Sequence, residues 1–243
     1  MNMTSVGFIY PGLGAADDFE VAPSLIPDFE VAFYNTDDGD VAHTVDDLLA
    51  VGDPALLKAH ALKLKAQHPD VSSIIWTCTS GSFVYTWQGA HAQAEAIEEA
   101  TGLPASSTSL AFAAAIEHLG LSHVAIAATY PSKVAQYFHD FIEDSGTKVT
   151  NMVCGEIPSA TGAGALSLDE VIEFAKQADT EATECVLIPD TAMHSIQWIG
   201  ALEQSLRKPV LTANQVSIWE GLRLTGASMP KVPALGRLFA EYR

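Results

Sequence analysis

A lone cysteine stands at the end of an apolar run and is followed by a row of hydroxyl groups. In the stretch "SIIWTCTSGSF", Cys78 precedes Thr79, Ser80 and Ser82. A thiol can attack carbon, or give and take a proton. Hydroxyls and backbone N–H groups at a helix start can bind an anion and lower a thiol pKa. The pattern therefore predicts a carboxylate-binding turn beside a reactive thiol, with a buried structural cysteine as the alternative.

A second polar turn, "LIPDTAMHS", follows another apolar run and contains Asp190, Thr191 and His194. Asp190 can act as a general base or change the pKa of a nearby thiol, and it can equally be an ordinary helix N-cap. His194 lies four residues later and would share a helical face with Asp190. We consider it a candidate proton shuttle, with an ordinary surface histidine as the alternative.

Two further turns supply candidate substrate-binding groups. In "AIAATYPSKV", Tyr130 ends a strand-like run and can donate its hydroxyl to a carboxylate. In "FIYPGLG", Pro11 ends the first strand-like run, without the glycine spacing of a nucleotide-binding loop. The histidines and cysteines show no metal-binding spacing, so we expect no metal site.

Alternating strands and helices must position these turns. Short, continuous apolar runs are typical of parallel strands that helices cover on both faces. The expected strands are Val6–Tyr10, Val31–Tyr34, Ser73–Thr77, Val124–Ala128, Val149–Val153, Cys185–Ile188 and Pro209–Thr212. The expected helices are Val45–Gln67, Phe83–Thr101, Ser107–Leu119, Pro131–Ser145, Ser167–Ala178, Ser195–Leu206 and Gln215–Gly226.

The two halves of the chain echo each other. Each has an apolar strand, a polar turn and a helix, then Pro104 or Pro209, a short strand and a second helix. The pattern predicts two Rossmann-like α/β lobes with parallel sheets related by pseudo-two-fold symmetry. We assign residues 1–115 and 220–243 to the first lobe and 116–219 to the second. Ligands bind beyond the carboxyl ends of parallel strands, so Cys78 and Asp190 are expected to face each other across one site.

The composition and charge of the chain argue against several classes of protein. The chain has 243 residues, 48% hydrophobic residues and a formal net charge of −18. Nucleic acid requires a basic surface, so this charge argues against it. No apolar run has the ~18 residues of a membrane span. The start lacks the basic region of a signal peptide, and three cysteines do not form a disulfide framework, so we expect a cytoplasmic protein.

These motifs resemble a known family. "CTSGSF" after a strand, "TYP" after another, and the ending "KPVLTANQVSIWEGLRLTG" are similar to the Asp/Glu racemase superfamily. Within it, the likeness is to the branch of arylmalonate decarboxylases and maleate cis-trans isomerases, and it covers essentially the whole chain. The resemblance implies two α/β lobes, no cofactor, a small carboxylate as substrate and a homodimer.

The resemblance also implies roles for single residues. Cys78 matches the first-lobe cysteine, which is the nucleophile of the isomerases, and Thr79, Ser80 and Tyr130 match the carboxylate-binding groups. Asp190 stands where the family has its second-lobe cysteine, so the chain departs from the two-cysteine pattern. The chain also lacks the asparagine that the isomerases tend to have after the first strand, although Asn214 lies in a later turn.

Several reactions fit one thiol, one opposed aspartate and an anion-binding turn. We place a maleate-type isomerase first, an arylmalonate-type decarboxylase second, and a racemase or lyase third. Each requires donors that stabilise an enediolate-like state. A sensor of small carboxylates, or an inactive partner protein, is the alternative outside the enzymes.

Overall fold

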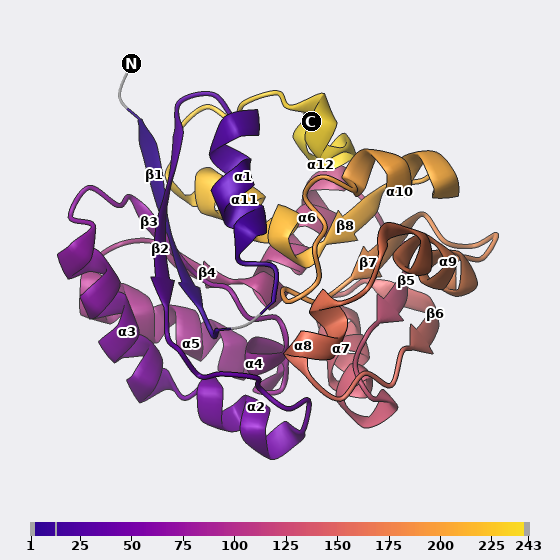
Figure 1. Ribbon diagram of the computed structural model, residues 1–243, viewed down its shortest axis with the longest axis horizontal. Coiled ribbons are helices and arrows are strands. Elements are labelled where there is room, and N and C mark those ends of the chain that lie inside the picture. The colour runs from indigo at the N-terminus through magenta and orange to yellow at the C-terminus, as the bar shows by residue number, and fades with distance from the viewer. Residues whose placement is uncertain (1–2, 13, 241–243) are drawn as a thin grey trace.

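Two four-stranded parallel sheets form the framework of the computed structural model, which describes residues 3–12 and 14–240 (Figure 1). The first sheet has the order β2-β1-β3-β4 and the second the order β6-β5-β7-β8. Both halves thus repeat one strand order, which confirms the predicted α/β class with two lobes. The strands are β1 (Thr4–Tyr10), β2 (Phe29–Asn35), β3 (Ser73–Trp76), β4 (Ala105–Ser107), β5 (His123–Ala128), β6 (Lys148–Cys154), β7 (Cys185–Ile188) and β8 (Val210–Thr212).

Helices connect the strands and cover the sheets. They are α1 (Asp17–Leu25), α2 (Val45–Val51), α3 (Pro54–Gln67), α4 (Ser80–Phe83), α5 (Thr86–Thr101), α6 (Thr108–Leu119), α7 (Ser132–Asp144), α8 (Ala160–Gly164), α9 (Leu168–Ala178), α10 (Ile199–Leu206), α11 (Ala213–Leu224) and α12 (Arg237–Ala240), with a short 3₁₀ helix at Pro233–Leu235. Helix α11 follows the second sheet in the chain but packs on β1 and β3 of the first. The residue numbers at which the lobes divide stay a prediction.

The prediction of a single helix over Val45–Gln67 was wrong. The structure has two helices there, because the Asp53 side chain accepts hydrogen bonds from the N–H groups of Ala55, at 2.9 Å, and Leu56, at 3.1 Å. Asp53 is thus a new N-cap, and Pro54 takes the first helical position, where its missing N–H costs nothing. Both signals for the start of a helix, an N-cap aspartate followed by a proline, can be read from the sequence.

Two other expected helices begin elsewhere. The helix expected from Phe83 is divided into α4 and α5, because Thr86 has a φ of +66° at the junction. The helix expected from Ser195 begins at Ile199. Residues 189–198 therefore form a loop, and this loop carries the second polar turn of the site.

Alternate residues along the strands enter different hydrophobic clusters, as the apolar runs predict. In β5, Val124 and Ile126 pack in a large central cluster, whereas Ala125 and Ala127 pack under α9 and α10. The central cluster also contains Val6 of the first sheet. One continuous core therefore passes through both lobes and fixes the two sheets relative to each other.

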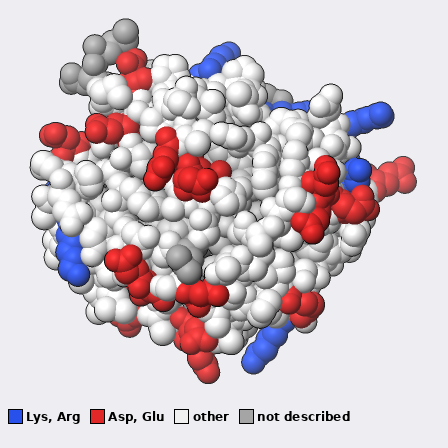
Figure 2. Space-filling view, in the orientation of Figure 1, with Lys and Arg blue, Asp and Glu red and all other residues white. Residues whose placement is uncertain are grey.

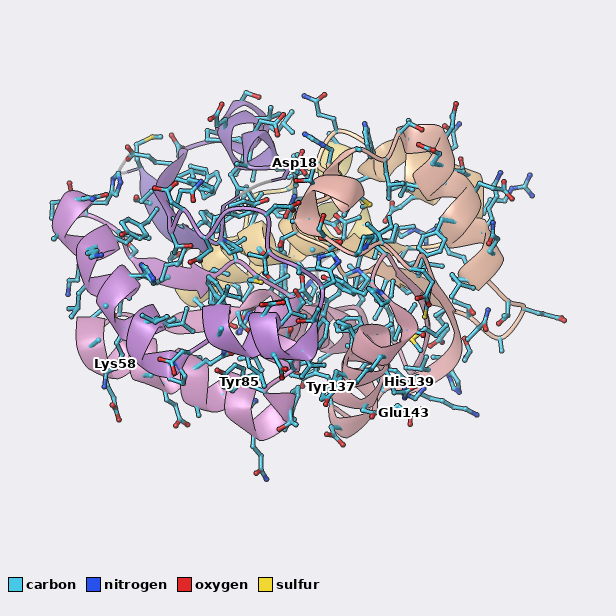
Figure 3. All side chains as sticks on the ribbon, turned by 60° about the horizontal axis from the view of Figure 1, so that its bottom comes forward. Asp18, Lys58, Tyr85, Tyr137, His139 and Glu143 are labelled. Carbon is cyan, nitrogen blue, oxygen red and sulfur yellow. The ribbon has the colours of Figure 1, made fainter. Side chains whose placement is uncertain are left out.

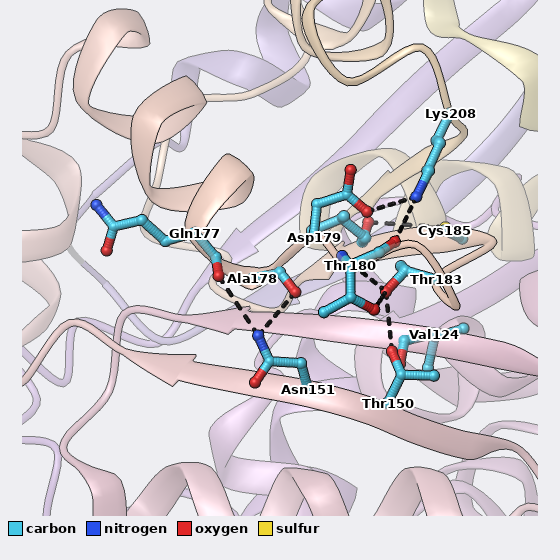
Figure 4. A network of polar contacts seen from close by, with 11 residues as sticks. Val124, Thr150, Asn151, Gln177, Ala178, Asp179, Thr180, Thr183, Cys185 and Lys208 are labelled. Carbon is cyan, nitrogen blue, oxygen red and sulfur yellow. Dashed lines mark hydrogen bonds and ion pairs between the residues drawn. The ribbon is translucent and has the colours of Figure 1, made fainter.

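A polar network ties the outer edge of the second sheet to the loop before β7 (Figure 4). The Lys208 ammonium contacts the Asp179 carboxylate at 2.6 Å and donates to the carbonyl of Thr180 at 2.7 Å. The Thr150 and Thr183 hydroxyls share a hydrogen bond of 2.9 Å. Cys185 is fully buried in β7 next to this network, as expected of a structural cysteine.

Acidic side chains are scattered over the face shown in Figure 2, and basic ones lie mainly towards its rim. The excess of acidic side chains agrees with the net charge of −18. In residues 3–12 and 14–240, no helix combines the length and the apolar character needed to cross a membrane.

Candidate active site

A small cavity lies between the lobes, beyond the carboxyl ends of the strands, with a volume of about 30 Å³. Its wall is formed by Tyr10, Pro11, Gly39, Val41, His43, Leu48, Cys78, Ser80, Ala160, Asp190, Thr191 and Ala192. The structure thus brings five of the predicted site residues to one cavity: Pro11, Cys78, Ser80, Asp190 and Thr191. A larger hollow of about 710 Å³, lined by Trp87, Glu98 and Arg223 among others, contains none of them.

Cys78 is positioned by the end of β3 and the start of α4. It is 5% exposed, and its Sγ accepts a hydrogen bond from the N–H of Gly81 at 3.3 Å. The hydroxyl of Ser80 lies 3.8 Å from Sγ. A short helix therefore holds the thiol at the cavity wall with a backbone donor beside it.

The expected lowering of the thiol pKa was wrong. Burial raises the pKa of Cys78 from 9.0 to about 11, which outweighs the opposite effects of the Gly81 N–H and the Ser80 hydroxyl. Loss of water disfavours the charged thiolate, and the four-residue helix α4 is too short to offset that loss. Cys78 consequently keeps its proton at neutral pH until another group accepts it.

Asp190 occupies the corresponding position in the second lobe. Like Cys78, it lies two residues beyond its strand, and it is 3% exposed. Its carboxylate accepts hydrogen bonds from the Thr129 hydroxyl and from the N–H of Ala192, the latter at 2.9 Å. Burial raises its pKa, and the nearby His43 opposes this shift. No α-helix starts here, so Asp190 is not the N-cap of a regular helix.

Two of the predicted carboxylate-binding groups form the layer behind the wall. Tyr130 is 1% exposed and donates its hydroxyl to the carbonyl of Pro189, and burial raises its pKa well above the usual value. The hydroxyl of Thr79 lies near the Tyr130 phenol but forms no hydrogen bond of good geometry with any described residue. A buried hydroxyl without a partner is costly, which is consistent with a ligand that supplies one.

The first strand contributes a residue that the sequence interpretation did not select. The Tyr10 hydroxyl crosses from the end of β1 to the carbonyl of Thr191 at 3.2 Å, and burial, then Asp190 and Cys78, raise its pKa. Close by, Gly14 has a φ of +118°, and a Cβ there would lie 2.5 Å from Cα of Ala192. The loops of the two lobes thus meet in direct contact at the site.

His43 was also missed. It follows β2, lines the cavity and is 6% exposed. It is a lone histidine in an acidic loop, and no local pattern marks it. Its place depends on tertiary contacts, since its backbone N–H donates to the carbonyl of Pro158 in the other lobe at 2.8 Å.

The structure places His194 and Asn214 away from the cavity. Nε2 of His194 contacts the Asp17 carboxylate at 2.9 Å, and Nδ2 of Asn214 donates to the Asp18 carboxylate at 2.9 Å. The buried Asp18, labelled in Figure 3, also accepts from the N–H groups of Ser195, at 2.8 Å, and Ile196, at 3.1 Å. We therefore remove both residues from the candidate site, because they take part in this contact between α1 and the Asp190 loop.

The part of the chain that the structure describes has no cluster of side chains suited to bind a metal ion. No group of three or more His, Cys, Asp or Glu side chains is arranged there to hold an ion. The site instead combines one thiol, one opposed carboxyl group, one imidazole and several hydroxyls. Such a set can transfer protons and form a covalent bond to carbon.

Comparisons with known proteins agree with this arrangement. Residues 51–239 match the family model described as arylmalonate decarboxylase. Arylmalonate decarboxylase of Bordetella bronchiseptica is 26% identical over 187 residues, which are 75% of this chain and 76% of that protein.

Solved structures of the same branch cover nearly the whole chain. A liganded double mutant of arylmalonate decarboxylase, in which a cysteine replaces a glycine and a serine replaces a cysteine, has a TM-score of 0.85 and 26% identity, covering 98% of this chain and 99% of that one. A cysteine-to-alanine mutant of the maleate isomerase of Pseudomonas putida S16, with maleate, has a TM-score of 0.87 and 19% identity, covering 98% of both chains. A mutant maleate cis-trans isomerase of Nocardia farcinica, with a covalently bound succinylcysteine intermediate, has a TM-score of 0.88 and 18% identity, covering 98% and 99%.

The two isomerases establish the shared fold, and the family model covers well over half of the chain. The chain is therefore an enzyme of the isomerase and decarboxylase class and belongs to the arylmalonate decarboxylase family.

Proposed function

We propose that this enzyme isomerises a small cis-unsaturated dicarboxylic acid of the maleate type, with Cys78 as the nucleophile and Asp190 as its proton partner. The observation that carries the proposal is that the two side chains border one cavity of about 30 Å³ from opposite sheets. Ser80 on the same wall, with Thr79 behind it, is the site for one substrate carboxylate. No step requires a group from outside the chain.

The proton follows a closed cycle. The Cys78 thiol is neutral at rest, because burial raises its pKa to about 11. Asp190 takes this proton as Sγ forms a bond to one alkene carbon, and it then gives the proton to the adjacent carbon. The resulting thioether has a single carbon–carbon bond, which rotates. The reverse steps return the proton to Sγ and release the trans product.

Asp190 suits this role because burial raises its pKa, so that it can carry the proton between the two steps. The charge of Asp190 also raises the pKa of Cys78, so the protonation state of one group affects that of the other. The addition places negative charge on the carboxylate next to the attacked double bond. We assign the stabilisation of that charge to the hydroxyl of Ser80, which lines the cavity, and to that of Thr79 behind it.

Decarboxylation of a small malonic acid is the second candidate, and the raised thiol pKa favours it. A neutral thiol is a proton donor, so Cys78 can protonate the enediolate that remains after carbon dioxide leaves. The family model and the relative from Bordetella bronchiseptica point in the same direction. Proton exchange next to a carboxylate, as in a racemase, would use the same two groups.

Proton NMR in D₂O distinguishes these reactions. Maleate, phenylmalonate and L-aspartate are each incubated with the wild-type protein, Cys78→Ala and Asp190→Asn. Cys154→Ser is the matched control, since Cys154 lies in β6 and does not border the cavity. We expect fumarate to form from maleate with the wild-type and Cys154→Ser proteins only.

Other outcomes count against the isomerase. Loss of carbon dioxide from phenylmalonate with gain of one deuteron, while maleate is unchanged, would support the decarboxylase. Exchange of the aspartate Cα proton would support the racemase. Fumarate formation that persists in Cys78→Ala would exclude the nucleophilic role of Cys78.

A further inference from the structure

The imidazole of His43 is held in one orientation at the cavity wall. Its Nδ1 lies 2.9 Å from the carbonyl oxygen of Ile157. A carbonyl can only accept, so Nδ1 carries a hydrogen and donates it. The ring also meets the Tyr130 ring edge-on, with centroids 4.8 Å apart and an angle of 74° between the planes. The position of His43 is thus fixed by groups of the second lobe.

The other ring nitrogen is left for a ligand. Among residues 3–12 and 14–240, none forms a hydrogen bond with Nε2 of His43. The side chain is more than nine-tenths buried and borders the same cavity as Cys78 and Asp190. The cavity is narrow, with a volume of about 30 Å³, so a ligand group that enters it comes close to all three side chains.

The charges around the cavity make Nε2 of His43 suited to bind an anion. The titratable groups that face His43 are Asp190, Cys78, Tyr10 and Tyr130. Asp40 lies nearby, and its pKa is lowered chiefly by the hydrogen bond from the Thr161 N–H and also by His43. All of these groups are neutral or negative. No lysine or arginine of the described chain borders the cavity. His43 is therefore the wall residue that can carry positive charge.

A substrate with two carboxylates brings two negative charges into this buried space. Burying charge without a partner is strongly unfavourable, and hydrogen bonds to charged groups are the strong ones. The hydroxyls of Ser80 and Thr79 provide neutral donors for one carboxylate only. A second carboxylate requires a donor of its own, preferably a cationic one.

We propose that Nε2–H of His43 binds the second carboxylate of the substrate, and that this contact makes the enzyme selective for dicarboxylic over monocarboxylic acids. The proposal rests on the proposed function in that the substrate is a small carboxylic acid at this site. It also bears on the reaction class. An imidazolium that holds a carboxylate stabilises the charged ground state, which slows loss of that carboxylate as carbon dioxide. Reactions that keep both carboxylates are favoured.

The surrounding loop is built to keep His43 in place. Ala42 and Ser159 form an isolated antiparallel bridge between the lobes. The N–H of Ala160 donates to the carbonyl of Val41 at 3.4 Å, and the N–H of Thr161 donates to the Asp40 carboxylate at 2.9 Å. Such support from the opposite lobe is what a preorganised binding group needs.

Titration calorimetry with ligands that do not react tests the proposal. Succinate and butyrate have the same chain length and differ by one carboxylate. His43→Asn is the informative variant, because its amide can still donate to Ile157 in place of Nδ1 but has no counterpart of Nε2. His43→Gln, whose amide can reach the position of Nε2, tests rescue. His68→Asn is the control, since His68 directly follows α3 and does not border the cavity.

We expect the wild-type and His68→Asn proteins to bind succinate at least about tenfold more tightly than butyrate. His43→Asn should reduce this preference to within about threefold while butyrate affinity stays the same, and His43→Gln should restore part of it. The proposal is overturned if His43→Asn keeps the full preference, if it weakens both ligands equally, or if the wild-type protein shows no preference.

A second measurement needs no variant and covers the case in which His43→Asn does not fold. Nitrogen-15 NMR of the wild-type histidine rings should show both His43 nitrogens protonated in the succinate complex, and the absence of this signature would contradict the proposal. Because neither test requires turnover, the two proposals can fail separately. A succinate preference that depends on His43, without conversion of maleate, would retain this inference and reject the isomerase.

Discussion

Cys78 and Asp190 occupy equivalent positions in the two lobes, each two residues beyond the third strand of its sheet and each on the wall of the same cavity. The repeated strand order thus places a thiol opposite a carboxyl group. Both groups are nearly inaccessible to water, so both have raised pKa values. This burial has measurable consequences for stability as well as for catalysis.

The raised thiol pKa predicts a loss of stability at alkaline pH. Between pH 9.0 and about 11, the unfolded protein releases the Cys78 proton before the folded protein does, so the free energy of unfolding falls as pH rises. The stabilising difference is fully present below pH 9.0 and is lost through the folded pKa. A shift of this size corresponds to about 3 kcal/mol.

Urea unfolding of the wild-type protein and Cys78→Ser across this pH range measures the effect. Serine does not titrate in this range, so the unfolding free energy of Cys78→Ser should fall by about that much less than that of the wild-type protein. Cys185 titrates without influence from Cys78 and affects both proteins alike. Parallel curves for the two proteins would show that the folded thiol has an ordinary pKa.

Asp18 is predicted to hold the Asp190 loop in position. Its Oδ2 accepts from the N–H groups of Ser195 and Ile196 and from Nδ2 of Asn214. Asp18→Ala leaves these buried donors without an acceptor, which should lower the free energy of unfolding by about 3 kcal/mol. Activity should fall as well, since the loop between Asp190 and Ser195 loses its attachment to α1.

Chemical denaturation compares Asp18→Ala with Asp17→Asn. Asp17 is the matched control, because its side chain is 61% exposed and its ion pair is with the partly exposed His194. We expect Asp17→Asn to change stability by less than about 0.5 kcal/mol. Equal effects of the two substitutions would mean that the Asp18 contacts contribute nothing specific.

Contact between the lobes at Gly14 predicts a second sensitive position. A Cβ at residue 14 would lie 2.5 Å from Cα of Ala192, and the φ of +118° is itself unfavourable for other residues. Gly14→Ala must therefore displace the loop next to Asp190. We expect at least a tenfold loss of kcat, about the effect of a small misplacement of reacting groups.

Gly102→Ala provides the comparison for Gly14→Ala. Gly102 also has a positive φ, of +70°, but a Cβ there would meet nothing within 4 Å. It should lower stability by about 1 kcal/mol and leave kcat unchanged. Wild-type kcat in Gly14→Ala would show that the two loops can separate without harm to the site.

Much of the fold followed from local patterns, whereas the full site did not. Apolar runs located seven of the eight strands, and β4, with two serines, was indicated only by the echo between the halves. The same echo placed Cys78 opposite Asp190. The thiol pKa was mispredicted, because the sequence shows the helix start but not the depth of burial. His43 escaped notice, since contacts with Ile157 and Pro158 of the other lobe bring it to the cavity.

The structure places His194 and Asn214 outside the cavity wall for a related reason. Both follow strands or turns of the second lobe and have the chemistry of site residues. Their partners are Asp17 and Asp18, which lie more than 170 residues away in the sequence. Spacing along the chain cannot distinguish a side chain that faces the cavity from one that binds a neighbouring helix.

Thr79 is predicted to favour ligand binding at the expense of stability. Its buried hydroxyl has no hydrogen-bond partner of good geometry among the described residues. Thr79→Val removes this unsatisfied group with little change of shape, so the free energy of unfolding should stay the same or rise by about 1 kcal/mol. If the hydroxyl binds the substrate carboxylate, KM should rise or kcat should fall, by about tenfold or more.

Thr108→Val is the matched control for Thr79→Val. Thr108 is equally buried, but its hydroxyl shares a hydrogen bond of 2.7 Å with that of Ser217. This substitution should lower the free energy of unfolding by about 1 to 3 kcal/mol, because it leaves the Ser217 hydroxyl with one partner fewer. Opposite effects of the two substitutions on stability, together with a loss of activity in Thr79→Val alone, would identify the Thr79 hydroxyl as a group kept for the ligand. Normal kinetics in Thr79→Val would instead remove Thr79 from the site and leave Ser80 as the hydroxyl that receives the first carboxylate.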